Sequence, residues 1–197
     1  MSIQKPSINP DFPIIEELRL RWSGRAYDSK PIPPEVIGSL FEAARWAPSS
    51  FNEQPWRFLV CERGTPEWEK LASTLNSFNS WSKNAALLVF ALAKNYLDHN
   101  NNPNSHAWHD TGLAIGSLLA QATREGLNVH QMGGFNAAQA MDLMEIPTGY
   151  DPISILAIGY RADSETLEET LYLREIAPQK RIPQSEFVFN RKWVNNK

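Results

Sequence analysis

The sequence predicts a protein of mixed α and β structure, in which amphipathic helices alternate with short apolar strands. Apolar side chains recur at helical spacing in several stretches, of which residues 36–44 are a clear example. The near-continuous apolar run from Ala85 to Ala93 is typical of a strand that is covered on both faces. With 197 residues, the chain is long enough for a sizeable core and is expected to form one domain over residues 1–197. The alternation alone permits either a parallel, doubly wound sheet or a mainly antiparallel one.

Composition excludes several functional classes. The net charge of −3 gives no field that would attract nucleic acid or an anionic membrane. The N-terminus lacks a hydrophobic signal region and no apolar run could span a bilayer, so a cytoplasmic protein is expected. The single cysteine, Cys61, excludes an internal disulfide framework and is expected to be a buried, unreactive thiol.

The N-terminal region combines a loose arm with a short cationic helix. Residues 1–12 are polar and are expected to be an arm, and a helix is predicted from Pro13 to about Gly24, where glycine permits a positive φ. Arg21 and Arg25 flank Ser23 at the end of this helix. Guanidinium groups suit a phosphate, because they form bidentate, charge-assisted hydrogen bonds with it. The alternative is a solvated helix end whose positive charge complements the helix dipole.

The central stretch, Ala47 to Trp56, joins a helix that starts at Pro34 to a strand over residues 56–61. Pro48 stops the helix, and Pro55 ends the loop. The loop between them offers hydrogen-bonding side chains from Ser49, Ser50, Asn52 and Gln54. A loop so rich in donors and acceptors suits a polar, planar ligand, although an ordinary helix-to-strand turn has the same composition.

The middle of the chain adds a helix opened by Thr65-Pro66, a polar segment, the strand at 85–93 and a long loop over residues 94–106. The strongest predicted helix follows over residues 108–125, and Gly126 closes it. Four of its residues are small, which lets another backbone come close and fits two helices that cross at a subunit interface: Gly112, Ala114, Gly116 and Ser117.

The last third begins with a strand over residues 128–132 and a Gly133-Gly134 turn. A helix capped by Asn136 and a buried strand over residues 153–158 follow. Thr166 and Glu169 match a capping box for a helix that reaches Ala177. Residues 187–189 are predicted as a final strand.

Several kinds of chemistry lack support. His106 and His109 could share a helix face, but no carboxylate or cysteine pattern completes a metal site, so no metal is expected. The sequence also lacks Gly-x-Ser-x-Gly, Walker and Gly-x-Gly-x-x-Gly motifs, which disfavours nucleophile, nucleoside-triphosphate and Rossmann readings.

Four motifs in order along the chain resemble the nitroreductase family of FMN-dependent oxidoreductases. They are Arg21-Trp22-Ser23-Gly24-Arg25, the gapless Ala47 to Trp56 stretch, Asp110 to Ala114 with Met132 to Phe135, and Gly159-Tyr160 with Lys180 to Pro183. The resemblance implies an α+β fold with a mainly antiparallel central sheet wrapped by helices. It also implies an intertwined homodimer with two FMN sites at the subunit interface.

The resemblance carries site roles onto matching residues of this chain. Arg21, Ser23 and Arg181 would hold the FMN phosphate, with Lys180 as a weaker candidate. Arg25 would lie near the N1/O2 edge of the ring, where a cation stabilises the anionic reduced form. The backbone N–H of Gly133 would contact N5, and an amide from Asn76 or Asn79 would contact the pyrimidine edge. The remaining contacts implied are Trp22, Met132 and Gly134, and, from the partner subunit, Pro48, Ser49, Ser50 and Asn52, with Gln54 also expected to bind.

The activity implied is ping-pong transfer of electrons from NADH or NADPH, through FMN, to a small electron-poor acceptor such as a nitroaromatic or a quinone. No side chain is expected to act as an acid or base, because the cofactor carries the chemistry. Family members often have an acidic residue where Gly133 stands, so polarity over the ring is expected to differ here. Two alternatives stay open: a protein that sequesters or delivers FMN without turnover, and a ligand-free structural dimer.

Overall fold

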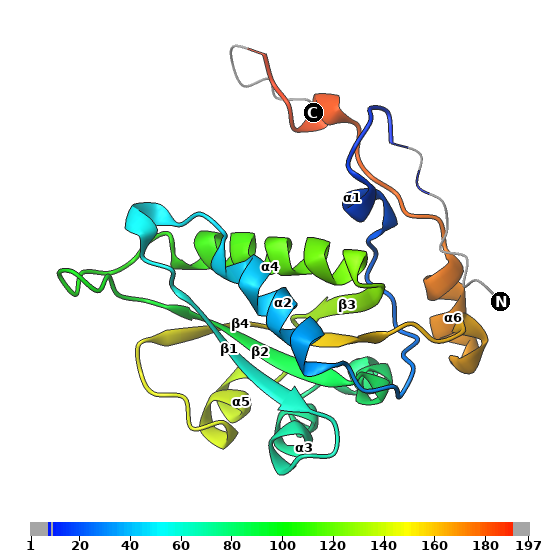
Figure 1. Cartoon of the computed structure of the whole chain (residues 1–197), viewed down its shortest axis with the longest axis horizontal. Helices are drawn as coiled ribbons and strands as arrows, with labels where there is room; N and C mark the ends of the chain where they lie inside the picture. The colour runs from blue at the N-terminus through cyan, green and yellow to red at the C-terminus, as the bar shows by residue number, and fades with distance from the viewer. Residues whose placement is uncertain (1–7, 9, 191–197) are drawn as a thin grey trace.

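A computed structural model describes residue 8 and residues 10–190 of the chain. Four strands form its sheet in the order β1-β2-β4-β3 (Figure 1). They are β1 (Trp56–Glu62), β2 (Leu87–Lys94), β3 (Leu127–Met132) and β4 (Tyr150–Tyr160). Each pair of neighbouring strands is antiparallel. This confirms the mainly antiparallel α+β prediction, and a parallel doubly wound sheet is excluded for the described strands.

Helices cover both faces of this sheet (Figure 1). The helices α2 (Pro34–Arg45) and α4 (Ala107–Arg124) pack on one face. The helices α3 (Pro66–Ser73) and α5 (Ala137–Leu143) lie on the other. Strand β2 is central and is covered from both sides, which explains its unbroken apolar run. Cys61 is buried as predicted, and burial raises the pKa of its thiol to about 11.

The predicted helix ends are confirmed where local signals are strong. Pro34 occupies the first turn of α2. The Thr65 hydroxyl accepts the Trp68 N–H at 3.3 Å, and the Asn136 side chain accepts the Gln139 N–H at 3.1 Å. Gly126, which follows α4, has a φ of +72°, a conformation that glycine adopts without strain.

The N-terminal helix is shorter than predicted. Helix α1 (Glu16–Leu20) begins after Ile15, so Pro13 is not in its first turn. Most of the arm predicted over residues 1–12 lies outside the described residues. Gly24 does not take the positive φ that its place after a helix suggested. Close packing explains the glycine instead, because a Cβ there would lie 2.5 Å from Asn128 Nδ2.

Two predictions for the C-terminal region are wrong within the described residues. Thr166 belongs to a short 3-10 turn, η3 (Ser164–Thr166), and its hydroxyl donates to the Asp163 carbonyl at 2.7 Å. Helix α6 (Glu169–Ile176) starts after Glu168 without a side-chain cap, so the capping box does not form. Residues 187–189 follow a 3-10 turn, η4 (Gln184–Glu186), and are not a strand in this chain.

The remaining connections place the predicted binding loops. The turn η1 (Ser50–Asn52) joins α2 to β1, and η2 (Ser77–Asn84) joins α3 to β2. The segment after α6 runs beside the α1 segment, away from the body of the molecule (Figure 1). Among the described residues, no helix is long and apolar enough to cross a membrane, and no three His, Cys, Asp or Glu side chains gather as metal ligands.

Candidate functional site

A cationic pocket lies where the α1 segment meets α6 and the C-terminal segment. It has a volume of about 220 Å³. Five of the residues predicted to bind the cofactor line it together: Arg181, from the other end of the chain, joins Arg21, Trp22, Ser23 and Arg25. The fold adds Arg174 and Gln179 to this lining, and neither was predicted.

The pocket favours an anion on electrostatic grounds. The pKa of Arg21 is lowered by burial and by the nearby positive charge of Arg181. The positive charges of Arg21 and Arg181 therefore oppose each other, and an anion between them would reduce this repulsion. Lys180 does not line this pocket: it is exposed, and its carbonyl accepts a hydrogen bond from the Arg181 guanidinium at 2.7 Å.

The segment that carries these arginines is packed against β3. The Gly24 N–H donates to Asn128 Oδ1 at 3.2 Å. The Gly24 carbonyl lies 3.1 Å from His130 Nδ1. Burial, then the charge of Arg25, lowers the pKa of His130 to about 4, so this imidazole is neutral at pH 7. A carbonyl can only accept, so the proton of the neutral ring must be on Nδ1.

The far end of β3 holds the second predicted group. Met132 is buried, and Gly133 and Gly134 follow it. A Cβ at Gly133 would meet nothing within 4 Å, so open space lies beside its backbone. A Cβ at Gly134 would lie 2.5 Å from the tip of the exposed Phe78 ring and 3.0 Å from Asn79 Nδ2, so a side chain there would require the Phe78 ring to turn aside.

The structure distinguishes the two candidate asparagines. Asn79 is only 6% exposed, and its Nδ2 donates to the Gly134 carbonyl at 2.9 Å. Asn76 is exposed and reaches the same carbonyl through its backbone N–H at 3.0 Å. The Asn79 side chain is therefore fixed beside the glycine turn, whereas only the backbone of Asn76 is.

Strand β3 connects the two groups. From Asn128 to Met132 it spans about 13 Å at the usual rise per residue. Between its ends, the His130 ring lies 4.5 Å from the Trp81 ring, and the Arg25 guanidinium lies 5.9 Å from that same ring. The arginine cluster and the glycine turn thus lie near opposite ends of β3, about 13 Å apart along the strand.

The loop predicted over residues 48–54 adopts a strained conformation. Phe51, Asn52 and Gln54 have φ values of 53°, 57° and 47°, in the left-handed region that non-glycine residues rarely adopt. The Ser49 hydroxyl accepts the Gln54 N–H at 3.0 Å, and the Gln54 amide donates to the Asn52 carbonyl at 3.0 Å. These bonds hold Ser49, Asn52 and Gln54 in place, and Phe51 is left 84% exposed.

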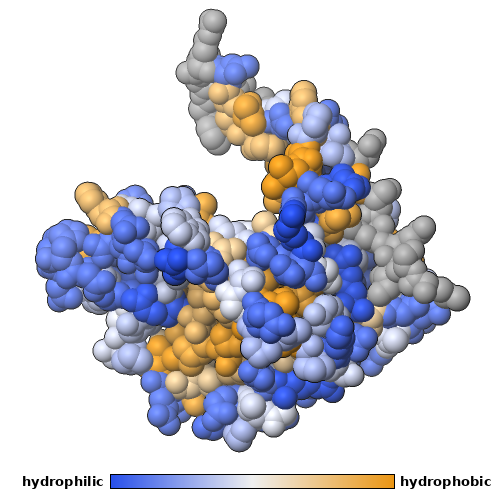
Figure 2. Space-filling model, viewed as in Figure 1, coloured by the Kyte–Doolittle hydropathy of each residue, from blue (hydrophilic) through white to orange (hydrophobic). Residues whose placement is uncertain are grey.

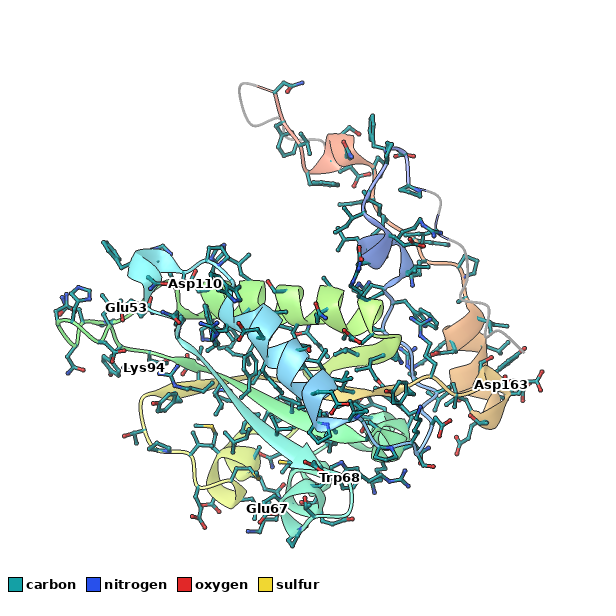
Figure 3. The ribbon with its side chains drawn as sticks, in the orientation of Figure 1. Glu53, Glu67, Trp68, Lys94, Asp110 and Asp163 are labelled. Carbon is teal, nitrogen blue, oxygen red and sulfur yellow. The ribbon has the colours of Figure 1, made fainter. Side chains whose placement is uncertain are left out.

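Two carboxylates fix this loop to its surroundings: Asp110 in the first turn of α4, and Glu53 of the loop itself (Figure 3). Asp110, which is 3% exposed, accepts the Ser50 N–H at 2.9 Å. Glu53 accepts the Asp98 N–H at 2.8 Å and lies 2.6 Å from His99 Nδ1. These two bonds lower the pKa of Glu53. The loop over residues 94–106 therefore buttresses the central stretch.

Replacing Asp110 with alanine is expected to destabilise the protein by about 1–3 kcal/mol, because the Ser50 N–H loses its acceptor in a partly buried place. Urea unfolding at pH 7 measures the change. Asp142→Ala is the matched control, since Asp142 is an exposed acid on α5 and its loss should fall within about 0.5 kcal/mol of zero. Equal stability of the two variants would contradict the role given to Asp110.

The 48–54 loop and the cationic pocket lie at opposite ends of α4. Asp110 near its start holds Ser50, and Arg124 at its end pairs with Glu17 of α1 at 3.1 Å. The fourteen helical steps from Asp110 to Arg124 span about 21 Å. One chain therefore brings Arg21, Ser23, Arg25 and Arg181 together, but it does not bring Pro48, Ser49, Ser50 or Asn52 to the same place.

Comparison with known proteins adds a family. The family model described as "Nitroreductase family" matches residues 18–77 and 65–160 of the chain. Residues 21–25, the 48–54 loop and the Gly133-Gly134 turn all fall within this match.

One relative and two solved structures are similar over most of their length. The crystal structure of an oxidoreductase containing FMN is 32% identical, covers 95% of this chain and 96% of its own, and superposes with a TM-score of 0.91. The FMN reductase [NAD(P)H] of Bacillus subtilis is 26% identical over 195 residues, which cover 90% of this chain and 75% of that protein. A putative nitroreductase in complex with FMN from Desulfovibrio desulfuricans is 23% identical, with a TM-score of 0.71 over 94% of this chain and all of the other. It shows likeness of fold.

Proposed function

The chain belongs to the nitroreductase family, and we propose that it is a single-domain, FMN-dependent oxidoreductase that moves electrons from NAD(P)H to small electron-poor acceptors. Nitroaromatics and quinones are the acceptor classes proposed. The observation that carries the proposal is the meeting of Arg21, Ser23, Arg25 and Arg181 in one pocket, although Arg181 comes 160 positions after Arg21. The relatives named FMN reductase and oxidoreductase containing FMN support the same cofactor class.

The residues present fit the phosphate end of FMN. Arg21 and Arg181 repel each other across the pocket, and a phosphate dianion between them would remove that repulsion. The Ser23 hydroxyl can donate to a third phosphate oxygen. Arg174 and Gln179 also line the pocket and are proposed as further contacts.

The residues at the other end of β3 fit the ring. The open space beside Gly133 allows its N–H to approach N5 of a flat ring without a Cβ in the way, and Met132 and Gly134 flank it. The Asn79 side chain, which Gly134 holds in place, is proposed to contact the pyrimidine edge. Bound FMN would supply the chemistry by accepting two electrons from the nicotinamide and giving them to the acceptor. The protein's own part is to bind, orient and tune it.

A homodimer completes the proposed site. Within one chain, about 21 Å of α4 separates Asp110, which holds the 48–54 loop, from Arg124 near the cationic pocket, so we propose that a second copy supplies that loop. The α1 segment and the C-terminal segment also carry exposed apolar side chains that a partner could cover (Figure 2). These are Phe12, Ile14, Ile15, Leu18, Ile182, Phe187 and Val188.

Mixing two defective variants tests the shared site. Arg21→Ala damages the pocket, and Asn52→Ala damages the loop. In a mixed dimer, one site combines both defects and the other combines two intact contributions. FMN binding should therefore reappear when the two variants are unfolded together and refolded. No recovery in dimers shown to be mixed would place the whole site within one chain.

A protein that only sequesters or delivers FMN is the second candidate, and the same pocket supports it. Turnover separates the two. Steady-state oxidation of NADH or NADPH with a quinone as acceptor should give parallel lines in double-reciprocal plots, because the nicotinamide leaves before the acceptor binds. FMN-loaded protein that binds the cofactor tightly yet shows no turnover with any quinone or nitroaromatic tried would favour the carrier.

A further inference from the structure

Among the described residues that line the cationic pocket, Glu175 alone bears a carboxylate. It comes from the last turn of α6 and is 7% exposed. A negative charge in the lining repels a bound anion and so weakens its binding. A carboxylate at this position therefore calls for another role. The contacts of Glu175 show what that is.

The Glu175 carboxylate contacts both the backbone and the side chain of Arg25. The Arg25 N–H donates to Oε1 at 3.1 Å and to Oε2 at 2.9 Å. The Arg25 Nη1 atom lies 3.7 Å from Oε2. A carboxylate that binds an N–H with both oxygens and also faces the guanidinium of the same residue fixes the direction in which that side chain leaves the backbone.

The Gly24 backbone lies close against the carboxylate. A Cβ on Gly24 would lie 2.8 Å from Oε1, which shows how closely the Gly24 backbone lies against it. Its charge also affects two neighbouring side chains. Burial is the main cause of the raised pKa of Tyr27, and the charge of Glu175 raises it further. Burial lowers the pKa of Arg161 to about 10, and the charge of Glu175 partly offsets this effect. Glu175 is therefore a fixed negative charge within this cluster.

Arg25 stands between this charge and the proposed ring end. Its guanidinium lies 5.9 Å from the Trp81 ring, which contacts His130 on β3. Positive charge near a flavin ring stabilises the reduced form, which carries negative charge at one edge. A counter-charge behind the cation weakens that stabilisation.

We propose that Glu175 is a positioning residue that aims Arg25 at the ring of bound FMN and offsets part of its charge, so that it lowers the reduction potential of the cofactor. This inference rests on the proposed function, because it requires FMN in the site. It goes beyond it by assigning to one buried acid of α6 the control of how readily the bound cofactor is reduced.

Glu175→Gln tests the inference, because glutamine keeps the shape and one acceptor for the Arg25 N–H but removes the charge. The dissociation constants of oxidised and of reduced FMN are measured on the apoprotein by anaerobic titration. Relative to the oxidised form, reduced FMN should bind about tenfold more tightly than in the wild type, which corresponds to a rise of about 30 mV in potential for a two-electron couple. Glu169→Gln, an exposed acid on the first turn of the same helix, is the matched control and should leave the ratio unchanged.

A second pair of variants separates the charge of Glu175 from its hold on Arg25. Arg25→Gln leaves Glu175 alone, whereas Arg25→Gln with Glu175→Gln removes both charges. The double variant should bind reduced FMN about tenfold more tightly, relative to oxidised FMN, than the single variant does. Equal ratios in either comparison, with FMN bound, would overturn the inference and leave the proposed function intact. A wild-type protein that binds no FMN would overturn both.

Discussion

Arg21→Ala is expected to weaken FMN binding by about a hundredfold. A bidentate, charge-assisted bond between a guanidinium and a phosphate contributes about 1.5–3 kcal/mol, and each 1.4 kcal/mol is a factor of ten. Arg21 is half-buried in the pocket it shares with Arg181, so the bond would be little screened by salt. Quenching of FMN fluorescence, titrated at two ionic strengths, measures the dissociation constant.

Arg63→Ala provides the comparison for Arg21→Ala. Arg63 is exposed on the turn after β1 and lies outside the cationic pocket. The two variants lose the same formal charge, so a general effect of net charge would weaken both equally. Loss of affinity in Arg21→Ala alone locates the phosphate in the pocket. Equal affinity for FMN in Arg21→Ala and the wild type would show that the phosphate does not bind in this pocket.

Gly24→Ala is expected to lower the free energy of unfolding by about 1–3 kcal/mol and to weaken FMN binding in the same protein. The added Cβ would lie 2.5 Å from Asn128 Nδ2 and 2.8 Å from Glu175 Oε1. Both side chains are buried and bonded to this segment, so neither can turn aside without losing a contact. The segment from Ser23 to Arg25 must shift, and the phosphate and ring contacts shift with it.

Gly38→Ala is the matched control for this substitution. Gly38 lies within α2, and a Cβ there would meet nothing within 4 Å. Alanine should stabilise that helix by about 0.5–1 kcal/mol, because it loses less backbone entropy on folding than glycine does. If Gly24 is packed in this way, chemical denaturation should show a lower free energy of unfolding for Gly24→Ala and a higher one for Gly38→Ala. Stabilisation in both would show that Gly24 is not packed in this way.

The sequence predicted best where the cause of a feature is local. Pro34 at the start of α2 and the Thr65 and Asn136 caps act within a few residues, so the pattern alone identifies them. The run at β2 is equally informative, because a strand apolar on both faces has to be central. Periodicity alone did not distinguish an antiparallel sheet from a parallel one, and the prediction of an antiparallel sheet came from the family resemblance.

The errors concern residues whose partners are distant in sequence. Thr166 matches a capping box, but Asp163 competes for its hydroxyl and draws it into a separate turn. Gly24 has the position of a helix-end glycine, yet the constraint on it comes from Asn128 and Glu175. A strand at residues 187–189 needs a neighbour, and the described part of one chain offers none.

The candidate site follows the same division. The motif identified Arg21, Ser23, Arg25 and Arg181, because each stands in a short recognisable segment. Glu175 was missed, since one acid in a polar helix carries no sign that it will face Arg25 from 150 positions away. Asp110 stood inside a recognised motif, but its bond to Ser50 depends on how α4 meets the loop. Both residues support the site through other residues, and that kind of role is visible only in three dimensions.

The most direct test of the proposed activity is the visible absorption spectrum of the purified protein, loaded with FMN if needed, before and after anaerobic addition of NADH or NADPH. The account predicts flavin bands that shift on binding and bleach when one nicotinamide is added, which would also identify the preferred donor. Bands that persist with both nicotinamides would contradict an NAD(P)H-driven enzyme. A colourless protein that also leaves the spectrum of added FMN unchanged would contradict the FMN site itself.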